Sequence, residues 1–501
     1  MLTVKVLGDF LGGQWFRPRG AEHKIVSRDP GDQGYRIGAF PVAPEHAETA
    51  VSAAVDAGPA WGRLPAAIRA DFLRKFAAEL VNRRGALARL LAAETGKPLW
   101  EAELEVSEAG GRVEMELREG QSHVQPIRIS EVRWGVSGEG RYRPLGATLV
   151  LGAAAAPLEQ PLGWILPALL AGNTVVFKPS KLVPAVGQAI AEIAEQIELP
   201  AGVLNLVQGE AEVGLKLVSD TRLAAVLFCG SHLSGARVVQ AALGRLNRMV
   251  ALAVGGINTA VVLSDADLGQ AVYECARGAF LTTGQRASST GVILVERGVL
   301  LEFLDAFGEA VRALKVGYAF EADVFMGPML SEAARARALD RQEQLERFGA
   351  RPLLRAEPLK LKRPGHYLSP AVWQLTRPEP IDSFRPDGQS FGPDVVLVPF
   401  DDDEQGQRLA GSTAYPLGAA VFTRDAARFE AWAEAVPYGL VNHNLATTDQ
   451  TSRLPFLGLG GAGSHRPSGV LAQHSCSFPQ ALLRATEPYD PSRNLPNFPR
   501  K

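Results

Sequence analysis

The chain has 501 residues, of which 46% are hydrophobic and 21% are charged. This length is too great for one compact core and predicts two or three domains, while the composition excludes an intrinsically disordered protein. The formal net charge of −2 at pH 7 supplies no overall field that attracts nucleic acid or an anionic membrane. We therefore expect no nucleic-acid partner and no membrane association.

The N-terminal segment, MLTVKVLGDFLGGQW, does not resemble a signal peptide, because Lys5 and Asp9 interrupt its apolar run. The most apolar stretch, residues 146–177, contains three prolines and a glutamate, so it is not expected to span a membrane. The three cysteines are far apart and show neither a disulfide pattern nor a zinc-ligand spacing. We expect a cytoplasmic protein without a metal site.

Residues 45–121 are predicted to form helices, because apolar residues recur at spacings of three and four. Residues 123–146 alternate like a β-hairpin, and a glycine-rich turn is expected near residues 138–140. This hairpin is too polar on both faces for a core pair, and a lone two-stranded hairpin is only marginally stable in water. An arm that adds to the sheet of another subunit would explain its composition.

From residue 147 onward, short β-branched runs alternate with helical segments. This alternation predicts a parallel sheet with helices packed on both faces. A second alternating series runs from about residue 258 to 450, so two α/β domains joined near residues 254–258 are expected. The last dozen residues are rich in proline and asparagine and are expected to form a loose tail.

Two short segments suggest a ligand site. In FCGSHLSG, a predicted strand ends at Gly230 and Ser231 and a helix opens near Gly235, so backbone N–H groups are free to meet a phosphate. Lys178 follows another strand, on the side of an open α/β sheet where ligands bind. Each feature also has a simpler interpretation, because a Gly-Ser pair often forms only a turn and a lone lysine is often only a solvated charge.

Several segments occur together in an order that resembles the aldehyde dehydrogenase superfamily over nearly the whole chain. They are PALLAGNTVVFKPS, LPAGVLNLVQG, FCGSHLSG, VGGIN, GQR, FGP and PFLGLGGAG. Within the superfamily, residues 199–209, the RYRPLG segment and GSHRPS at 463–468 are most similar to the succinylglutamate semialdehyde dehydrogenases. The resemblance implies an aldehyde dehydrogenase-like α/β fold, with two doubly wound α/β domains and a β-hairpin oligomerisation arm.

The resemblance also implies a division of the chain. Residues 1–122 and 147–254 would form a Rossmann-like NAD-binding domain, and residues 255–452 would form a catalytic-type domain. Residues 123–146 and 468–487 would form the oligomerisation arm, and residues 488–501 would remain a loose C-terminal tail.

The catalytic positions implied by the resemblance all carry alanine. In the superfamily a cysteine thiolate attacks the aldehyde, a glutamate activates water and an asparagine amide holds the oxyanion. These three positions are Ala287, Ala253 and Ala155 in this chain. Loss of a nucleophile alone costs about 10⁶-fold in a comparable acyl-transfer enzyme, so no intact catalytic residue and no dehydrogenase activity are expected.

The cofactor site implied by the resemblance, for NAD or NADP, is weakened. Its positions carry Lys178, Ser180, Lys181, Gly230, Ser231, Gly235, Gln389 and Phe391. Lys181 replaces an acidic residue that would accept hydrogen bonds from the ribose, and it is interpreted either as a contact to a phosphorylated ribose or as a solvated charge. Gln389 replaces a glutamate that holds the nicotinamide ribose, and its amide still forms hydrogen bonds.

The substrate pocket implied by the resemblance includes Arg286, Ser288 and Arg466. Two interpretations of Arg466 remain open: a bidentate clamp for a dicarboxylate and an ion pair at a subunit interface. Cys229 is expected to be a buried core thiol beside the cofactor pyrophosphate, and Cys275 a buried thiol in a helix.

Two hypotheses of function follow. The first is a catalytically inactive member of the superfamily with a binding, regulatory or structural role, as a homo-oligomer (a dimer or tetramer) or as a hetero-oligomer with an active homologue. The alternative is an oxidoreductase that acts on an aldehyde with NAD(P) through relocated or residual chemistry. The first is favoured, because alanines at the three positions leave no unpaired charge in the pocket.

Overall fold

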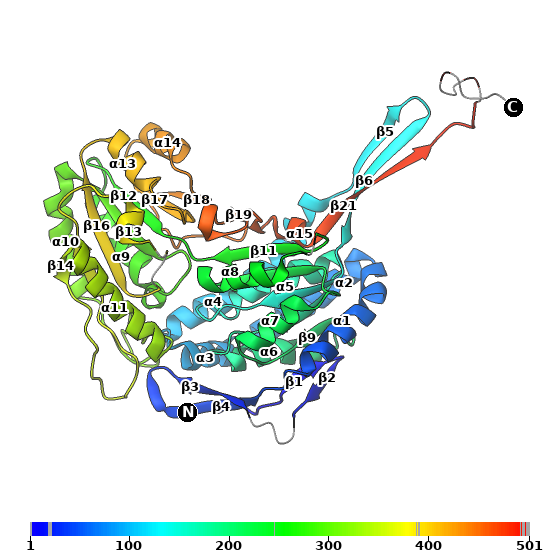
Figure 1. Cartoon of the computed structure of the whole chain (residues 1–501), viewed down its shortest axis with the longest axis horizontal. Helices are drawn as coiled ribbons and strands as arrows, with labels where there is room; N and C mark the ends of the chain where they lie inside the picture. The colour runs from blue at the N-terminus through cyan, green and yellow to red at the C-terminus, as the bar shows by residue number, and fades with distance from the viewer. Residues whose placement is uncertain are drawn as a thin grey trace.

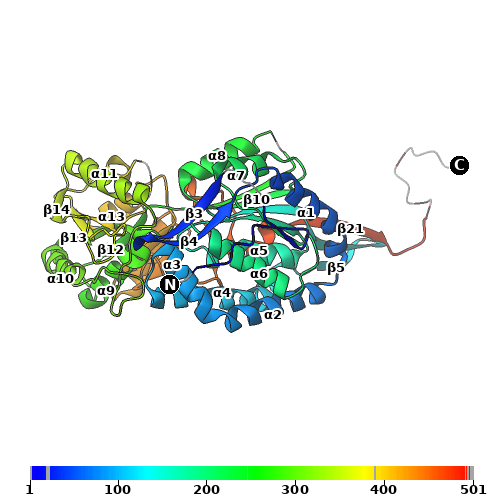
Figure 2. The same cartoon turned by 90° about the horizontal axis from the view of Figure 1, so that it is seen from below.

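The computed structural model describes residues 3–18, 23–244, 246–386, 388, 391–490, 492 and 496. Two seven-stranded sheets form the body of the molecule, and a three-stranded arm projects from the side of the first sheet (Figure 1). The view from below shows the same arrangement, with the arm directed away from the second sheet (Figure 2).

The first sheet has the strand order β11-β10-β7-β8-β9-β1-β2. Its strands are β1 (Asp9–Leu11), β2 (Gln14–Phe16), β7 (Ala147–Leu151), β8 (Thr174–Lys178), β9 (Leu204–Leu206), β10 (Ala225–Gly230) and β11 (Met249–Val254). Strands β7 to β11 pair in parallel, and the side chains of β7 and β8 are buried throughout. Their uninterrupted apolar character fits a parallel sheet that is covered on both faces.

Eight α-helices accompany the first sheet in the described part of the chain. They are α1 (His46–Arg63), α2 (Ala66–Asn82), α3 (Arg84–Thr95), α4 (Leu99–Arg118), α5 (Glu159–Ala171), α6 (Pro184–Gln196), α7 (Ala211–Ser219) and α8 (His232–Ala242). The helices predicted over residues 45–121 are thereby confirmed. Helix α3 is capped at its C-terminus by Gly96, which has a left-handed φ of 76°, and Pro98 directly precedes α4, so the Gly-Lys-Pro segment separates the two helices.

The second sheet has the strand order β14-β15-β16-β13-β12-β17-β18. Its strands are β12 (Asn258–Val262), β13 (Thr290–Glu296), β14 (Arg351–Leu354), β15 (Ala371–Gln374), β16 (Asp394–Phe400), β17 (Gly418–Phe422) and β18 (Leu440–His443). Its helices are α9 (Leu268–Phe280), α10 (Leu300–Arg312), α11 (Glu332–Phe348), α12 (Ile381–Phe384), α13 (Asp403–Ala410) and α14 (Ala426–Ala435), with the 3₁₀ turns η2 (Leu281–Gly284) and η3 (Arg297–Val299). The predicted α/β fold with two largely parallel sheets is confirmed.

The arm consists of β5 (Ile127–Arg133), β6 (Val136–Pro144) and β21 (Ser477–Ala485), in the order β21-β6-β5. The hairpin is confirmed, but its predicted turn near residues 138–140 is wrong. The chain reverses at Trp134 and Gly135, where Gly135 has a φ of 69°. Gly138 and Gly140 instead lie inside β6, where a Cβ on Gly138 would come within 2.4 Å of the Val132 side chain. Gly138 therefore allows close strand packing rather than a turn.

The C-terminal part of the arm begins later than residue 468. Residues 468–469 form β20, which pairs with β19 (Pro455–Phe456), and Ala472–Ser475 form the short helix α15. Only from Ser477 onward does the chain pair with β6. Most of the predicted loose tail, residues 488–501, lies outside the described residues.

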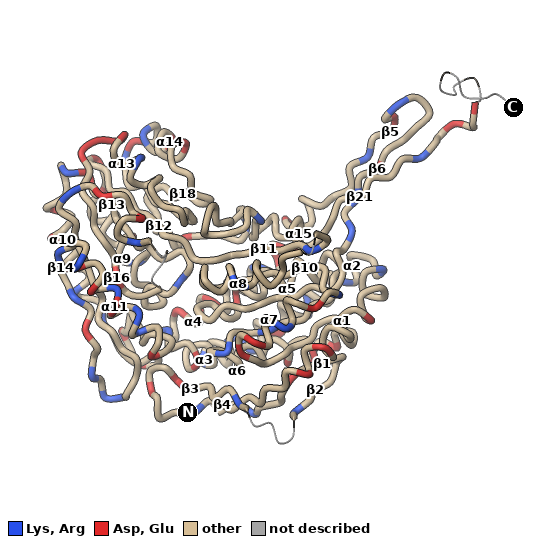
Figure 3. Tube along the Cα trace, in the orientation of Figure 1, with Lys and Arg blue, Asp and Glu red and all other residues tan. Residues whose placement is uncertain are grey.

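The remaining elements are β3 (Lys24–Asp29) and β4 (Asp32–Pro41), which pair with each other, and the 3₁₀ turns η1 (Gly120–Val124) and η4 (Gly460–Ala462). Acidic and basic residues are scattered over both sheet-containing parts of the molecule and along the arm (Figure 3). In the described part of the chain, no helix is both long and apolar enough to cross a membrane. The same residues contain no cluster of side chains that could hold a metal ion.

Candidate functional site

Ala253 and Ala287, two of the three predicted catalytic positions, line one small cavity of about 50 Å³. Ala253 lies near the carboxyl end of β11, in register with Cys229 on β10. Ala287 lies in the loop between η2 and β13, and Asn258 holds this loop by donating to the Ala287 carbonyl oxygen at 2.9 Å. The cavity has room for only a few water molecules, so it is too small for a nicotinamide ring.

Ala155, the third predicted position, does not line this cavity. Its carbonyl oxygen accepts a hydrogen bond of 2.8 Å from the buried Lys97 ammonium group. Lys97 is also paired with Glu105, whose second carboxylate oxygen accepts from the backbone N–H of Leu158 at 2.9 Å. This satisfied ion pair anchors the loop before α5, so Ala155 contributes its backbone rather than its side chain.

Cys229 lies in the wall of the small cavity, together with Ala253 and Ala287. The prediction of a buried thiol is confirmed, but the sequence did not indicate that this thiol faces the same cavity as the alanines. Trp164 donates an indole N–H to the sulfur at 3.2 Å. Burial raises the pKa of the Cys229 thiol to about 12, so at neutral pH it remains protonated and weakly nucleophilic.

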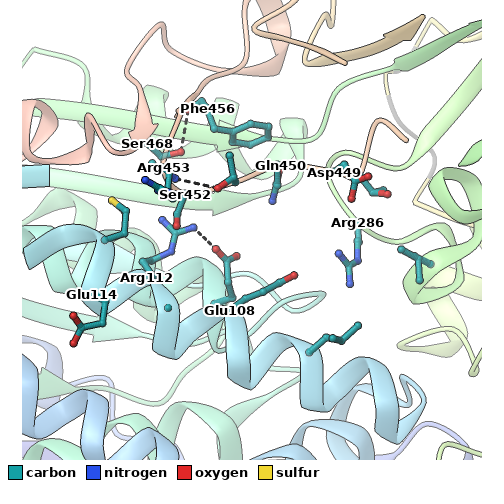
Figure 4. A pocket seen from close by; sticks show the side chains of 18 of the residues that line it. Glu108, Arg112, Glu114, Arg286, Asp449, Gln450, Ser452, Arg453, Phe456 and Ser468 are labelled. Carbon is teal, nitrogen blue, oxygen red and sulfur yellow. Dashed lines mark hydrogen bonds and ion pairs between the residues drawn. The ribbon is translucent and has the colours of Figure 1, made fainter. Parts of the chain in front are cut away.

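A second, much larger cavity of about 740 Å³ lies next to the small one. Trp100, Leu104, Glu108 and Arg112 follow one another at four-residue intervals on α4, so they share one face of the helix and line one wall. The segment 448–453 lies across from them, as Figure 4 shows. This cavity has the size of a site for a small ligand.

An ion pair separates the two cavities. Arg112 and Glu159 line both of them, and their guanidinium and carboxylate groups are in direct contact in a largely buried position. Phe456 also lines both cavities. Removing one charged partner of a buried pair is costly, so this partition is a stable part of the fold.

Arg286, predicted to belong to the substrate pocket, lines the large cavity. Its guanidinium group donates to Glu101 at 2.8 Å and to the Thr282 hydroxyl at 2.9 Å. Although burial acts in the opposite direction, Arg286 and Lys97 hold the pKa of Glu101 below its ordinary value. The side chain of Arg286 is therefore held against the cavity wall by a buried carboxylate.

The other two predicted pocket residues lie elsewhere. Arg466 lines the small cavity and not the large one, and it forms no ion pair within the described part of the chain. Ser288 is buried and lines neither cavity, and its carbonyl oxygen accepts from the Thr447 hydroxyl at 2.7 Å. Ser288 therefore lies outside the pocket that the resemblance implied.

Lys178 is the last residue of β8, and Ser180 and Lys181 follow it in the next loop. Lys178 is only 7% exposed, donates to the Pro179 carbonyl oxygen at 2.8 Å, and has its pKa lowered to about 8 by burial. Lys181 is paired with Glu210 at 3.1 Å, and the Ser180 hydroxyl accepts from the Leu182 N–H at 3.3 Å. All three polar groups are thus already engaged within the protein.

Gly230 ends β10 and Ser231 precedes α8, which begins at His232, so the helix opens three residues before the predicted position near Gly235. The Ser231 hydroxyl caps the helix by accepting from the Ser234 N–H at 3.3 Å. A Cβ on Gly230 would lie 2.5 Å from the Phe228 ring, and one on Gly235 would lie 2.9 Å from Val254. These glycines are required by the protein's own packing, so they do not by themselves indicate a nucleotide.

His232, which the sequence did not single out, connects this turn to the C-terminal glycine-rich segment. Its ring nitrogen Nδ1 lies 2.8 Å from the Gly461 carbonyl oxygen. The ring also contacts Tyr415 edge to face, with 5.0 Å between centroids. These contacts hold the N-terminus of α8 against η4.

The cavity at Ala253 and Ala287 is too small for a dinucleotide, although a separate cavity of about 290 Å³ beside α8 is lined by His232, Gly235 and Gly461. The small cavity cannot hold its ring, and the polar groups near Lys178 have internal partners. Phe391 has a left-handed φ of 49°, and Gln389 lies outside the described residues. We therefore assign no chemical step to a nucleotide.

Sequence reasoning missed the charged residues that shape the large cavity. Glu108, Arg112 and Glu159 are the clearest examples. On α4 the acidic and basic residues alternate in the manner of a solvated helix surface. Nothing in that pattern distinguishes a helix face that lines a cavity from one that faces bulk water.

Comparison with known proteins adds an independent result. The profile of the aldehyde dehydrogenase family matches residues 15–478. The N-succinylglutamate 5-semialdehyde dehydrogenase of Burkholderia thailandensis is 34% identical over 492 residues, which cover 98% of this chain and 99% of that protein. Its namesake from Burkholderia cenocepacia is 34% identical over 481 residues, covering 95% of this chain and 96% of that protein.

The fold is likewise similar to solved structures. Lactaldehyde dehydrogenase from Escherichia coli has a TM-score of 0.89 and 27% identity, over 96% of this chain and 100% of that chain. Aldehyde dehydrogenase from Brucella melitensis biovar abortus has a TM-score of 0.89 and 26% identity, over 96% of this chain and 97% of that chain.

Proposed function

The chain belongs to the aldehyde dehydrogenase family, and from this premise we propose that it binds a small molecule in its large cavity without oxidising it. Enzymes of this family generally use NAD or NADP. The observation that carries the proposal is the alanine at each of the three positions that the resemblance identifies as catalytic, Ala155, Ala253 and Ala287. A methyl group forms no bond to a carbonyl carbon and donates no hydrogen bond.

The surroundings of these alanines support the proposal. Ser289, two residues beyond Ala287, has a buried hydroxyl without a hydrogen-bond partner in the described structure, but no base is in contact with it. A serine hydroxyl without a neighbouring base is a poor nucleophile. The thiol of Cys229 is protonated at neutral pH for the reason given above. Neither group therefore replaces the missing cysteine.

The test is an assay of the purified full-length chain with N-succinylglutamate 5-semialdehyde and a panel of simple aldehydes, in the presence of NAD⁺ or NADP⁺. We expect no NADH or NADPH above the blank. The Burkholderia thailandensis relative, assayed in parallel, is the positive control. Turnover that copurifies with this chain through two different chromatographic steps would overturn the proposal.

A second candidate function is an oxidoreductase with relocated chemistry. It is motivated by the turn at Gly230 and by Lys178, which lie where the resemblance places a nucleotide. Calorimetric titration with NAD⁺, NADH, NADP⁺ and NADPH separates the two functions. We expect weak binding or none, because the polar groups of this region have internal partners, and tight binding of any of the four would favour the second function.

The arm supports a proposal about assembly. Strand β5 is exposed along its whole length, and it carries the apolar side chains of Ile127, Ile129 and Val132. A strand edge of this kind is a template for pairing with another chain. We propose a homo-oligomer, a dimer or tetramer, or a hetero-oligomer with an active homologue; native mass measurement of the pure chain distinguishes a monomer from both.

A further inference from the structure

The charged side chains that line the large cavity balance one another. Five arginines and five carboxylates contribute to the wall, namely Arg112, Arg118, Arg277, Arg286 and Arg453, and Glu108, Glu114, Glu119, Glu159 and Asp449. Four of these carboxylates pair with four of the arginines. The remaining arginine, Arg286, pairs with the buried Glu101, and the remaining carboxylate, Glu108, is exposed to solvent. The lining therefore carries no net charge that would select an anionic or a cationic ligand.

Three of the ion pairs lie largely inside the protein. The side chains of Arg112, Arg277 and Arg286 are at most 23% exposed, and each contacts a carboxylate directly. A charged ligand that binds one member of such a pair leaves the other member without its partner, which is costly in a buried position. The other two arginines, Arg118 and Arg453, are themselves exposed, so water screens their interaction with an added charge. The wall thus disfavours a ligand of either sign.

Apolar side chains from separate segments meet in the same wall. Trp100 and Met115 come from α4, Leu281 from η2, Phe325 from the segment between α10 and α11, and Phe456 from β19. A ligand with apolar surface gains free energy when it and these side chains are removed from water together. Pockets for small molecules are generally lined in this way, with a few polar groups that set the orientation of the ligand.

Trp100 is held in place before any ligand binds. Its indole N–H donates to the Val324 carbonyl oxygen at 2.9 Å. Its ring also packs against Phe325, with 6.0 Å between centroids and 35° between the ring planes. Such offset aromatic contacts are favourable. An aromatic ligand can therefore pack on this pair without first ordering the side chains, which preserves affinity.

The segment across from α4 adds uncharged hydrogen-bonding groups. Gln450 and Ser452 line the cavity on that side (Figure 4). Within the described part of the chain, neither side chain has a hydrogen-bond partner. An amide and a hydroxyl both donate and accept hydrogen bonds. They therefore suit a neutral polar group of a ligand, such as an amide.

We propose that the large cavity binds an uncharged ligand that carries an aromatic ring and one neutral hydrogen-bonding group. The ring packs against Trp100 and Phe325, and the polar group bonds to the 448–453 segment. This inference deepens the binding function proposed above and rests on it. It follows from the charge balance and the aromatic side chains of this chain's own cavity, and not from the substrate that its relatives' names state.

The test is isothermal titration calorimetry of the full-length chain with three probes of similar shape. Phenylacetamide is neutral, phenylacetate is an anion and 2-phenylethylammonium is a cation. We expect phenylacetamide to bind at least about tenfold more tightly than either charged probe, because a charged group that loses water without gaining a partner is costly.

Two variants test the aromatic pair. Trp100→Leu keeps an apolar side chain and removes the ring, and it should weaken phenylacetamide binding about three- to tenfold. Phe325→Leu should have an effect of the same order, and it leaves the Trp100 hydrogen bond to Val324 in place. Trp134→Leu is the matched control, because Trp134 is an exposed tryptophan in the turn of the arm, outside the cavity. It should leave the affinity unchanged.

Three results would overturn the proposal. The first is tighter binding of either charged probe than of phenylacetamide. The second is phenylacetamide binding that both Trp100→Leu and Phe325→Leu leave unchanged in correctly folded protein. The third is the absence of binding by all three probes.

None of these results alters the assignment as a protein without dehydrogenase activity, because that assignment is tested by NADH formation from aldehydes. Conversely, detectable NADH formation would remove the proposed function even if phenylacetamide binds. The two failures are therefore distinguishable.

Discussion

At the scale of single residues, the cavity beside Ala287 contains one sulfur atom. The Cys229 thiol lines the same 50 Å³ cavity as Ala253 and Ala287, and within the described part of the chain its one hydrogen bond is accepted from the Trp164 indole. Thiol reactivity depends on the thiolate form and on access. Burial reduces both the fraction of thiolate and the access of reagents to the Cys229 sulfur. Its position next to Ala287 therefore does not make it a nucleophile.

The burial and the raised pKa of the Cys229 thiol predict that it is alkylated slowly. With iodoacetamide at pH 7.5, the native chain should be modified at Cys229 at least about a thousandfold more slowly than the unfolded chain, because a thiol of pKa about 12 is almost entirely protonated. Peptide mass spectrometry locates the label. Cys275 and Cys476 are buried as well and serve as internal references. Rapid labelling of Cys229 alone would contradict the assigned environment.

At the scale of elements, α6 depends on a carboxylate from another helix. No side chain at its own N-cap position, Val183, provides a hydrogen bond. Instead Glu94, near the end of α3, accepts from the backbone N–H groups of Ala185 at 2.9 Å and Val186 at 2.8 Å, and from the Ser27 hydroxyl at 2.6 Å. A buried helix N-terminus needs such partners, so Glu94 links α3, α6 and β3.

Glu94 makes folding stability depend on pH. Burial raises its pKa in the folded state from 4.5 to about 7, so the folded protein keeps a proton that the unfolded chain releases as pH rises between these values. The contribution of Glu94 to the free energy of unfolding therefore decreases as pH rises through this window. Between pH 5 and 8 the wild type should lose about 2–3 kcal/mol more stability than Glu94→Gln, which has no carboxyl to titrate.

Urea unfolding of both proteins at several pH values measures this difference. The exposed Glu103 on α4 provides a matched control, because Glu103→Gln should leave the pH profile of the wild type unchanged. If the stabilities of wild type and Glu94→Gln run parallel from pH 5 to 8, the buried carboxyl does not titrate in this range.

At the scale of the whole molecule, the two cavities are separated by elements from different parts of the chain. Arg112 belongs to α4, Glu159 to α5, and Phe456 to β19. The small cavity is further narrowed by Trp164 and Leu457. Two of the three predicted catalytic positions, Ala253 and Ala287, thus lie in a cavity of only about 50 Å³.

The small volume of this cavity predicts that placing the family's catalytic side chains at the three alanine positions does not restore catalysis. The variant with Ala287→Cys, Ala253→Glu and Ala155→Asn should produce no NADH or NADPH above the wild-type blank, because larger side chains at Ala253 and Ala287 enter a cavity of about 50 Å³ that is already too small for the nicotinamide ring. The measurement is absorbance at the NADH band with aldehyde and either nucleotide. Mass spectrometry of the labelled thiol verifies that the new cysteine is present. Turnover by the triple variant would show that the cavity opens in solution.

Several features of this chain follow from local sequence alone. The period of apolar residues determined the helices between residues 45 and 121, and the β-branched runs after residue 147 determined the buried parallel strands. These patterns can be recognised within a short stretch of sequence, because the side chains that face the core recur with the period of the helix or strand. The alanines at 155, 253 and 287 are equally visible without coordinates, since the absence of a functional group does not depend on the fold.

Other features were decided only by the tertiary structure. The turn of the arm lies at Gly135 rather than at residues 138–140, and Gly138 instead lies inside β6, where a side chain would clash with Val132. Cys229 faces the same cavity as Ala287, because β10 and β11 pair in a particular register. Three arginines of the large cavity, Arg112, Arg286 and Arg453, pair with carboxylates from distant segments, namely Glu159, Glu101 and Glu119. Charge pairing and cavity closure are long-range relations, so they become visible only when the chain is folded.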